Sequence, residues 1–302
     1  MIYTVTCNPS LDYTMWLPTV QPNRVLRSTR EQLSYGGKGI NVSAIAARLG
    51  ADTCALGFVA GFTGEHLQTL LDEDGIANDF VQLSNGRTRI NIKLFGQEEW
   101  DVNATGPTVD EQAADKLLQK IETLSTGDVL ALGGTVPKGL PNDFYLQLLK
   151  RVQGHGVLTV VDAEGDLLRR SLEFRPFLIK PNHHELGALF DRTDCDADEL
   201  IDCARRLQQE GARNVLVSRA SKGALLVDET GEVHHIGTVS GEVRNAVGCG
   251  DSMVAGFLVG WLQRGEYAYA LRLGAACGNA TAFSDKLATR EEIDRVLACF
   301  EA

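Results

Sequence analysis

Apolar residues recur with two different periods that alternate along most of the chain, and this alternation constrains the fold more than any other feature. Short apolar runs are typical of buried strands, whereas the longer stretches between them place apolar residues three to four positions apart, as on one face of a helix. The strand-like runs are residues 3–7, 53–59, 128–132, 157–161, 177–180 and 215–218, and the helical patterns are residues 42–49, 65–74, 109–124, 142–153, 197–210 and 253–262. This order predicts an α/β fold in which helices cover both faces of a mostly parallel sheet.

The chain offers no obvious point of division. Its 302 residues suffice for one large α/β domain or two small ones. The sequence contains no internal repeat, no low-complexity tract and no linker rich in Ser, Gly or Pro. We therefore expect a single domain over residues 1–302.

Residues 87–94 depart from the alternation because they repeat with a period of two. In a strand, Arg89, Asn91 and Lys93 would share one face, and the opposite face would be apolar. A half-polar strand does not suit the middle of a sheet that is covered on both sides. We expect a small accessory sheet that also uses residues 10–35, although the solvent-exposed face of an edge strand would explain the same pattern.

A glycine-containing turn, Gly248-Cys249-Gly250-Asp251, leads directly into the last helical pattern. Glycines let the backbone bend and expose its N–H groups, and a helix N-terminus adds unpaired donors and the positive end of a dipole. Such a turn suits an anion, and an acid is useful there if a phosphoryl group passes through while a hydroxyl is oriented for attack. N-capping of the helix by Asp251 or Ser252 is the structural alternative.

Three further polar or glycine-rich turns follow expected strands or begin helices. Lys38 and Asn41 follow two glycines at a helix start; the lysine can meet a phosphate, but the Walker A spacing is absent and a plain turn fits as well. Residues 133–141 close another strand. Asn182 and Glu185 fit either a capping box or a water-mediated Mg²⁺ site. Together with the Gly248–Asp251 turn, these segments are expected at the carboxyl ends of strands, where open α/β sheets bind ligands.

The net charge of −11 argues against general binding to nucleic acid or to anionic membranes, so an anionic substrate needs a local basic pocket. Seven cysteines form no C-x-x-C pair, and we expect mostly buried thiols in a reducing compartment. The expected location is the cytoplasm, because we find neither a signal-peptide profile nor an apolar run of 18 residues. The histidine pairs 183–184 and 234–235 are not expected to share a metal, because adjacent side chains point apart.

Together these motifs resemble the PfkB branch of the ribokinase-like carbohydrate kinases over nearly the whole chain. The resemblance rests on motifs in the family's order and spacing, namely Thr6-x-Asn8-Pro9-Ser10-x-Asp12, Gly36-Gly37-Lys38-Gly39-x-Asn41, Lys180-Pro181-Asn182-x-x-Glu185 and Gly248-x-Gly250-Asp251. It implies a ribokinase-like three-layer αβα sandwich with a small β lid, formed by residues 10–35 and 87–105, that closes over the sugar. Residues 88–93, 162–165 and 183–184 look most like the 1-phosphofructokinase subgroup.

The resemblance also implies roles for individual residues. Asp251 would be the catalytic base, and the N–H groups of Gly248, Cys249 and Gly250 would form the anion hole. ATP and Mg²⁺ would be the cofactors. The residues implied in substrate binding are Asp12, Gly37, Lys38, Asn41, Arg89, Lys93 and Thr135, those near ATP are Lys180, Asn182, Ser218, Gly223 and Asn279, and those that serve the metal are Asn182 and Glu185. Lys38, Arg89 and Lys93 would hold the phosphate that the substrate already carries.

The implied activity is the ATP-dependent phosphorylation of a ketohexose phosphate, with fructose 1-phosphate converted to fructose 1,6-bisphosphate by a homodimer that pairs through the lid. Tagatose 6-phosphate, or fructose 6-phosphate as in the minor-type 6-phosphofructokinases, is the alternative substrate. A fold that only senses a nucleotide or sugar phosphate is a rival of another class, but the retained Asp251 with both glycines argues against it. A Rossmann oxidoreductase is a weaker rival, because no G-x-G-x-x-G follows the first strand.

Two residues of the Gly248–Asp251 turn lead to further predictions. A helix N-terminus favours the ionised form of Asp251, which would make it a weak base that takes the proton late. Cys249 stands where the family usually has alanine, and a thiol beside the reacting phosphate would make the protein sensitive to oxidants.

Overall fold

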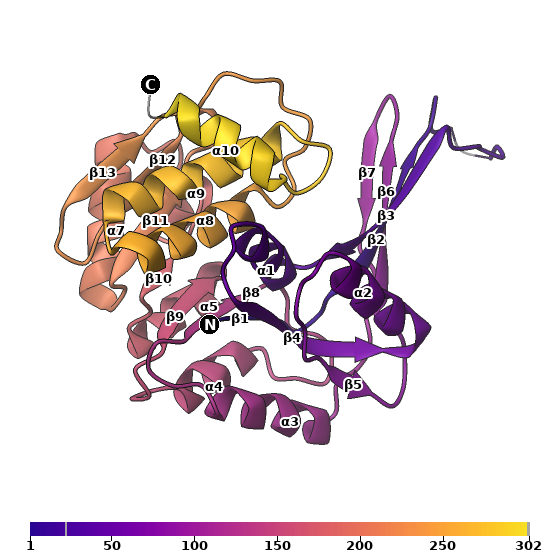
Figure 1. Cartoon of the computed structure of the whole chain (residues 1–302), viewed down its shortest axis with the longest axis horizontal. Helices are drawn as coiled ribbons and strands as arrows, with labels where there is room; N and C mark the ends of the chain where they lie inside the picture. The colour runs from indigo at the N-terminus through magenta and orange to yellow at the C-terminus, as the bar shows by residue number, and fades with distance from the viewer. Residues whose placement is uncertain (22, 301–302) are drawn as a thin grey trace.

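A nine-stranded sheet runs through the centre of the protein (Figure 1). The computed structural model describes residues 1–21 and 23–300, so residue 22 of the expected lid and the last two residues of the expected domain lie outside it. In spatial order the strands are β13 (Val233–Ile236), β12 (Ala224–Val227), β11 (Asn214–Ser218), β10 (Leu178–Ile179), β9 (Leu158–Asp162), β8 (Val129–Gly133), β1 (Ile2–Thr6), β4 (Thr53–Ala60) and β5 (Val81–Leu83). Neighbours from β11 to β5 are parallel, and β12 and β13 add an antiparallel edge.

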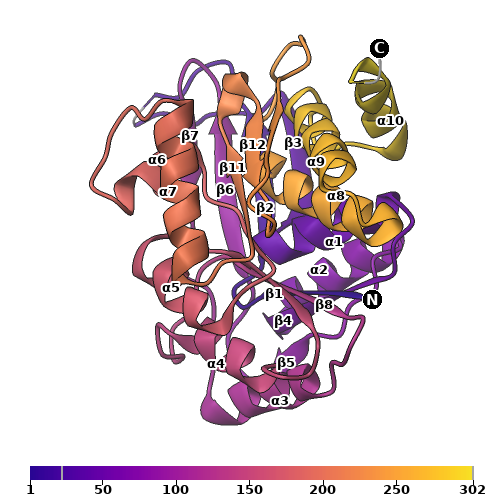
Figure 2. The same cartoon turned by 90° about the vertical axis from the view of Figure 1, so that its left-hand side faces the viewer.

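Helices cover both faces of this sheet, as Figures 1 and 2 show. One face packs against α1 (Lys38–Arg48), α8 (Cys249–Arg264), α9 (Tyr267–Ala282) and α10 (Arg290–Cys299). The other face packs against α3 (Glu111–Glu122), α4 (Phe144–Arg151), α5 (Gly165–Ser171), α6 (His183–Ala188) and α7 (Ala197–Glu210). The predicted three-layer arrangement with a mostly parallel sheet is thus confirmed.

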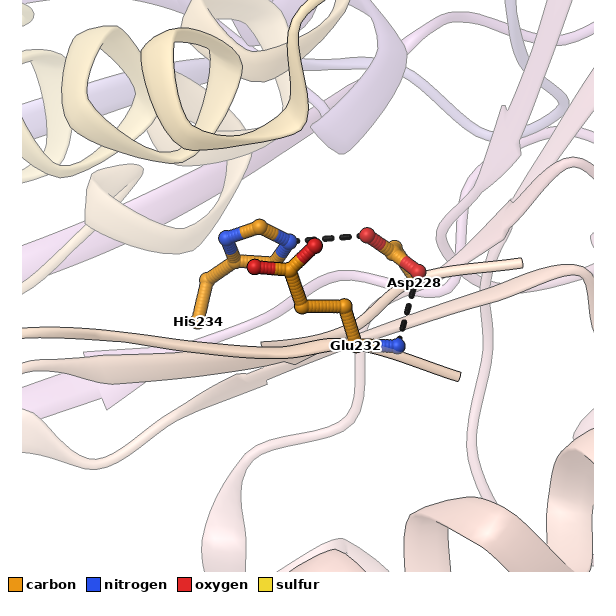
Figure 3. Close-up of side chains that lie close together, drawn as sticks. All are labelled: Asp228, Glu232 and His234. Atoms are coloured by element: carbon orange, nitrogen blue, oxygen red, sulfur yellow. Dashed lines mark hydrogen bonds and ion pairs between the residues drawn. The ribbon is translucent and has the colours of Figure 1, made fainter. Parts of the chain in front are cut away.

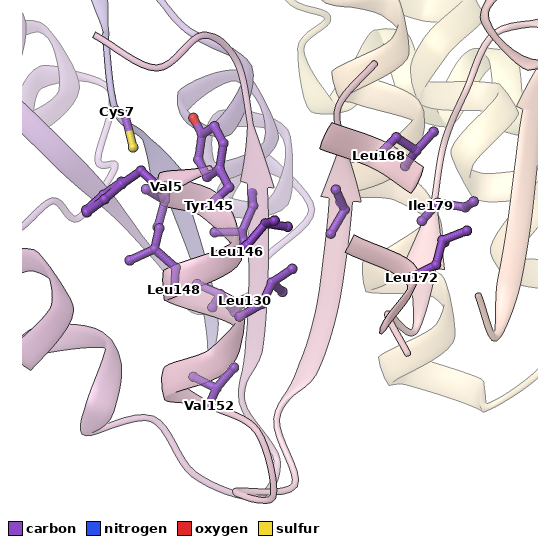
Figure 4. Close-up of a cluster of buried hydrophobic side chains, with 14 of the residues drawn as sticks. Val5, Cys7, Leu130, Tyr145, Leu146, Leu148, Val152, Leu168, Leu172 and Ile179 are labelled. Carbon is purple, nitrogen blue, oxygen red and sulfur yellow. The ribbon is translucent and has the colours of Figure 1, made fainter. Parts of the chain in front are cut away.

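The central strands contribute side chains to both layers of helices. Along β8, Leu130 and Leu132 pack into the cluster on the α3–α7 side, part of which Figure 4 shows, whereas Val129 and Ala131 pack on the α8–α9 side. Because both faces of the strand are buried, its sequence is continuously apolar rather than alternating. Fully burying one such valine or leucine side chain contributes about 1.5–3 kcal/mol.

A second sheet projects from the body of the protein (Figure 1). Its strands, in spatial order, are β3 (Arg30–Gly36), β2 (Ser10–Trp16), β6 (Arg89–Phe95) and β7 (Glu99–Val102), and α2 (Gly61–Glu73) packs beside it. The polar side of β6 is turned inward, because Asn91 is buried while Ile90 and Ile92 are exposed. The alternative interpretation, a solvent-exposed polar face on an edge strand, is therefore wrong.

Candidate active site

The segments that follow β1, β8, β9 and β10 meet at one edge of the large sheet. These strands are parallel, so their carboxyl ends lie side by side and the polar residues that follow them converge. The N-terminus of α1 also lies here, where its N-cap Gly37 has a φ of 133°. A Cβ at this position would lie 2.6 Å from Cγ2 of Thr6, so glycine is required for close packing against β1.

The N-terminus of α8 presents backbone donors without a side-chain cap. Its N-cap residue is Gly248, with a φ of 80°, and no side chain accepts a hydrogen bond from the first turn. A Cβ at Gly248 would lie 2.7 Å from Cδ2 of Leu287, so a larger residue would also clash. N-capping by Asp251 or Ser252 is therefore wrong as an explanation of this sequence. The N–H groups of the first turn are free to bind an anion.

Asp251 lies in the first turn of α8 and is only 7% exposed. Its Oδ2 accepts a hydrogen bond of 2.8 Å from Nδ2 of Asn41, which α1 positions. Burial, followed by the charge of Asp162, raises the pKa of Asp251 to about 6, against the opposing effects of Asn41 and two lysines. The expectation of a weak base is therefore wrong, because the loss of water outweighs the helix dipole.

Lys38 and Lys180 share the carboxylate of Asp162, which ends β9. Their Nζ atoms lie 3.2 Å and 3.6 Å from Oδ1 of Asp162. Burial lowers the pKa of Lys38, but Asp162 and Asp251 raise it and the net shift is upward. Nζ of Lys180 would lie 3.1 Å from a Cβ at Gly250, so glycine leaves room for this ammonium group. Two cations thus lie beside the N-terminus of α8, where a phosphoryl group would need them.

Asp162 is a site residue to which the sequence prediction assigned no role. The available signal was its position, since an acid directly follows a buried apolar run and precedes Ala163-Glu164-Gly165. Such an acid also occurs where a strand simply ends. Only the approach of Lys38, which is far away in the sequence, identifies its function.

A cleft of about 440 Å³ lies between the second sheet, α1 and the segment before α8. Four residues predicted to bind substrate line it: Asp12, Gly37, Asn41 and Lys93. Oδ2 of Asp12 pairs with Nζ of Lys93 at 3.1 Å, and Oδ1 accepts a 3.0 Å hydrogen bond from Asn91. This wall of the cleft offers polar groups that suit sugar hydroxyls.

The structure does not bring the three predicted phosphate-binding cations together. Lys93 lies in the cleft, but Lys38 is paired with Asp162 at the sheet edge. Arg89 donates a 3.0 Å hydrogen bond from Nε to the backbone oxygen of Asn8. Among the described residues, neither Lys38 nor Arg89 lines the cleft.

Residues predicted to lie near the nucleotide and metal gather after β10 and β11. Asn182 and Ser218 form an isolated parallel bridge between these two segments. Oδ1 of Asn182 accepts the N–H groups of His184 and Glu185 at 2.9 Å, and Oε2 of Glu185 accepts the N–H of Asn182 at 2.8 Å. The capping box is thus present, and it leaves the second carboxylate oxygen of Glu185 for another partner.

Three other residues, Gly223, Asn279 and Thr135, were predicted to belong to the site. Gly223 has a φ of 80°, and a Cβ there would lie 2.0 Å from the backbone oxygen of Ile236. Asn279, on α9, accepts a 3.3 Å hydrogen bond from the N–H of Val239 and so tethers the loop before α8. Thr135 is exposed just after β8.

The Cys249 thiol is held in its protonated form. Its Sγ lies 3.4 Å from the backbone oxygen of Asn245, to which it donates. Burial, and then the charge of Asp251, raises the pKa of Cys249 to about 11. Because the thiolate is the reactive species, this environment argues against the expected sensitivity to oxidants.

One group of potential metal ligands occurs among the described residues, and it belongs to the β12–β13 hairpin (Figure 3). Asp228 accepts hydrogen bonds from the N–H groups of Thr230 and Glu232, and its other oxygen lies 2.8 Å from Nε2 of His234. These bonds stabilise the turn and explain the group without a metal.

The other histidine pair does not behave as predicted. The rings of His183 and His184 face each other, with their centroids 3.9 Å apart, so the expectation that adjacent histidines point apart is wrong here. Among the described residues, this pair belongs to no larger group of potential metal ligands.

Comparison with known proteins identifies the family. The profile of the pfkB family carbohydrate kinases matches residues 6–292. The chain belongs to this family. The 1-phosphofructokinase of Bacillus subtilis is 40% identical over 298 residues, which cover 98% of this chain and 97% of that protein. The D-tagatose-1-phosphate kinase of Bacillus licheniformis is 35% identical over 297 residues, which cover 98% of this chain and 97% of that protein.

Solved structures of pfkB family kinases share the fold. The crystal structure of phosphofructokinase-2 from Escherichia coli in complex with fructose-6-phosphate superposes with a TM-score of 0.92 at 28% identity, covering 100% of this chain and 99% of that one. As a pfkB family carbohydrate kinase, the chain transfers a phosphoryl group from ATP to a hydroxyl, not a hydride as an oxidoreductase would. None of its described helices is both long and apolar enough to span a lipid bilayer.

Proposed function

We propose that this pfkB family kinase phosphorylates a ketohexose phosphate with ATP, and that fructose 1-phosphate, converted to fructose 1,6-bisphosphate, is its preferred substrate. The observation that carries the proposal is the buried Asp251, held by Asn41 at the junction of the cleft and the uncapped N-terminus of α8. A proton acceptor and free N–H donors thus lie together beside a cleft of sugar size. The similarity to 1-phosphofructokinase and to D-tagatose-1-phosphate kinase supports a ketohexose carrying a 1-phosphate.

In the proposed reaction, Asp251 orients the acceptor hydroxyl and takes its proton. A pKa of about 6 leaves the carboxylate mostly ionised at neutral pH and makes it a stronger base than an ordinary aspartate. The N–H groups of Gly248, Cys249 and Gly250 face the oxygens of the transferred phosphoryl group, where charge accumulates. Lys180, beside Gly250, neutralises part of this charge.

The sugar is bound on the cleft side. Asp12, Gly37 and Asn41 bind its hydroxyls, and the ion pair with Asp12 fixes the position of Lys93 in the cleft. The assignment of Lys38 to the existing phosphate of the substrate remains a prediction, as do those of Arg89 and Thr135. The contacts of Lys38 suit the transferred phosphoryl group at least as well, because it shares Asp162 with Lys180.

The nucleotide is bound after β10 and β11, near Lys180, Ser218, Gly223 and Asn279. Mg²⁺ fits Asn182 and Glu185 through water, since the capping box uses one carboxylate oxygen of Glu185 and leaves the other free. When bound, Mg²⁺ would neutralise charge on the phosphates of ATP. Glu185 would hold its water ligands, and Asn182 would fix the orientation of Glu185.

We also propose that the second sheet is a lid that closes over the sugar and pairs two copies of the chain in the cytoplasm. Its outer face is apolar where solvent would favour polar residues. Ile90, Ile92, Trp100 and Val102 are 37%, 38%, 51% and 54% exposed. Trp100→Glu should therefore shift the protein from dimer to monomer in analytical ultracentrifugation, and a wild-type monomer would refute the pairing.

A substrate panel tests the activity. Fructose 1-phosphate, tagatose 6-phosphate, fructose 6-phosphate and tagatose 1-phosphate should be compared by kcat/KM with Mg-ATP in a coupled ADP-release assay. We expect the highest value for fructose 1-phosphate. Binding of ATP without turnover of any of these sugars would favour the sensor and refute the proposal.

A further inference from the structure

One face of helix α1 is connected to the N-terminus of α8 at two points. Asn41 and Arg48 lie seven positions apart on α1, so their side chains share this face. Asn41 holds Asp251 through a hydrogen bond of 2.8 Å. Arg48, two turns further along, reaches the segment between α9 and α10, and Leu287 of that segment contacts the turn before Asp251.

The guanidinium group of Arg48 fixes the backbone of this segment. Its Nη1 donates to the backbone oxygens of Leu287 and Ala288, at 2.8 Å and 3.0 Å. Its Nη2 donates to the hydroxyl of Tyr35 at 3.3 Å and to the carboxylate of Asp74 at 3.4 Å. Because a planar guanidinium group bonded at both ends has little freedom to rotate, Arg48 holds the Leu287–Ala288 segment in one position relative to α1.

Hydroxyl groups join the same segment to the first turn of α8. The N–H of Ala288 donates to Oγ1 of Thr281 at 3.2 Å, and this hydroxyl lies 2.9 Å from Oγ of Ser252. Thr281 and Ser252 are both fully buried, and Ser252 directly follows Asp251. Because buried polar groups are costly to leave unpaired, a shift of the segment would also displace this turn.

Leu287 brings the segment into direct contact with Gly248. Its Cδ2 lies 2.7 Å from the position that a Cβ on Gly248 would take, and Nδ2 of Asn41 lies 3.5 Å from the same position. Helix α1 therefore places both neighbours of Gly248, Asn41 directly and Leu287 through Arg48. The N–H groups of this turn can stabilise developing charge only if they are held in the correct orientation before the reaction.

We propose that Arg48 is a positioning residue for phosphoryl transfer, which keeps the N–H groups of the Gly248–Asp251 turn aimed at the transferred phosphoryl group. The inference rests on the proposed function, in which these N–H groups face the oxygens where charge accumulates. Arg48 also lines the cleft, so direct contact with the sugar phosphate is the competing role. Positioning lowers kcat, whereas loss of a direct contact that is made equally in the ground state raises the KM of the sugar phosphate.

Steady-state kinetics with fructose 1-phosphate and Mg-ATP separates these two roles. Arg48→Leu should lower kcat about 10- to 100-fold. This is less than the loss of about 10²- to 10³-fold expected when a donor is removed, because the N–H groups remain but are displaced. Both KM values should change by less than about threefold. Arg48→Lys, whose ammonium group can still donate to the backbone oxygens, should recover part of kcat.

Arg169→Leu is the matched control. Arg169 also pairs with a carboxylate, that of Glu210, and donates at 3.4 Å to the backbone oxygen of Leu189, but it lies on the other face of the sheet. This variant should leave kcat and both KM values unchanged. Isothermal titration with ATP counts the binding sites, and kcat is expressed per site, so a loss of folded protein is not counted as a loss of catalysis.

A double-mutant cycle tests whether Arg48 acts through Leu287. Leu287→Ala removes the contact with Gly248 and should by itself lower kcat. Because both substitutions disturb the same contact, the double variant should lose less than the product of the two single losses. Losses that multiply would show that the two residues act independently and would overturn the inference.

The position of the turn can also be measured without turnover. In NMR spectra of protein that carries isotopically labelled glycine, the amide signals of Gly248 and Gly250 should shift in Arg48→Leu, while that of Gly231, between β12 and β13, should not. Unchanged signals of Gly248 and Gly250, or a raised KM with unchanged kcat, would overturn the inference. Wild-type protein that phosphorylates none of the sugars in the panel would refute the proposed function, and the glycine signals would still decide this inference.

Discussion

Replacing Asp251 with asparagine should abolish catalysis and at the same time stabilise the fold. Burial, followed by the charge of Asp162, raises the pKa of this carboxyl from 3.8 to about 6. A rise of about two pKa units corresponds to about 3 kcal/mol, the free energy by which the folded state disfavours the ionised form. Asparagine has the same shape, and its oxygen can still accept the hydrogen bond from Asn41, but it carries no charge.

The stabilisation should depend on pH with a definite sign. The folded pKa lies above the unfolded value, so ionisation of Asp251 costs stability as the pH rises from about 4 through 6. We expect Asp251→Asn to raise the free energy of unfolding by about 3 kcal/mol at pH 8 and by about half as much at pH 5. Below about pH 3 the difference should nearly vanish, because wild-type Asp251 is then mostly protonated in both states.

Urea unfolding at pH 8 and pH 5, together with the ADP-release assay, measures both effects. Turnover should fall about 10³-fold, as expected when the proton acceptor is lost, while isothermal titration should show unchanged ATP binding. Asp143→Asn, which alters an exposed carboxylate paired with Arg170, should change neither quantity. Near-wild-type turnover would refute the base role. An equal gain in stability at both pH values would refute the reasoning from a buried charge.

Three further perturbations test other parts of the site. Asn41→Leu removes the 2.8 Å hydrogen bond that favours the ionised form of Asp251 and should therefore raise the pKa of Asp251 further. The fall of kcat/KM on the acid side, expected near pH 6, should move to higher pH. An acid limb that stays at the same pH would contradict this reasoning. Cys249, with a pKa of about 11, should react with iodoacetamide more slowly than exposed Cys299, and faster labelling would show a thiolate. Glu185→Gln should raise the Mg²⁺ concentration for half-maximal activity several-fold without affecting the KM of the sugar, and an unchanged Mg²⁺ requirement would remove Glu185 from metal binding.

The sequence predicted those parts of the fold that local signals specify. The helix predicted over residues 197–210 has the same bounds in the structure, because a capping box at Asp196 begins it and Gly211, with a φ of 140°, ends it. Helix α9 was not predicted. Its small residues, mostly alanine and glycine, pack closely against α8 and leave no clear apolar stripe. Strands β12 and β13 were not predicted either, because the four apolar residues of β12 do not distinguish a strand from a loop and two histidines interrupt the apolar pattern of β13.

The sequence marked candidate residues of the site, but it could not show which of them contact one another. Asp251 and Asn41 both stand in glycine-rich turns, which marked them as candidates, yet their contact joins residues 210 positions apart in the sequence. The pKa of Asp251 depends on how completely the fold excludes water, and a sequence motif carries no such information. The resemblance likewise assigned Lys38 and Arg89 to one phosphate, and the sequence could not show that Lys38 pairs with Asp162 at the sheet edge.

The charges at the sheet edge also imply how the base responds to ATP. Lys38 and Lys180 lower the pKa of Asp251, while burial and Asp162 raise it. In the proposed reaction the terminal phosphate of ATP brings negative charge close to the same lysines, so the pKa of Asp251 should rise further when ATP binds. The acid limb of kcat, which reports the bound complex, should then lie at higher pH than that of kcat/KM, which reports the free enzyme. If the acid limbs of kcat and kcat/KM lie at the same pH, the two lysines do not interact electrostatically with both the phosphate and the carboxylate.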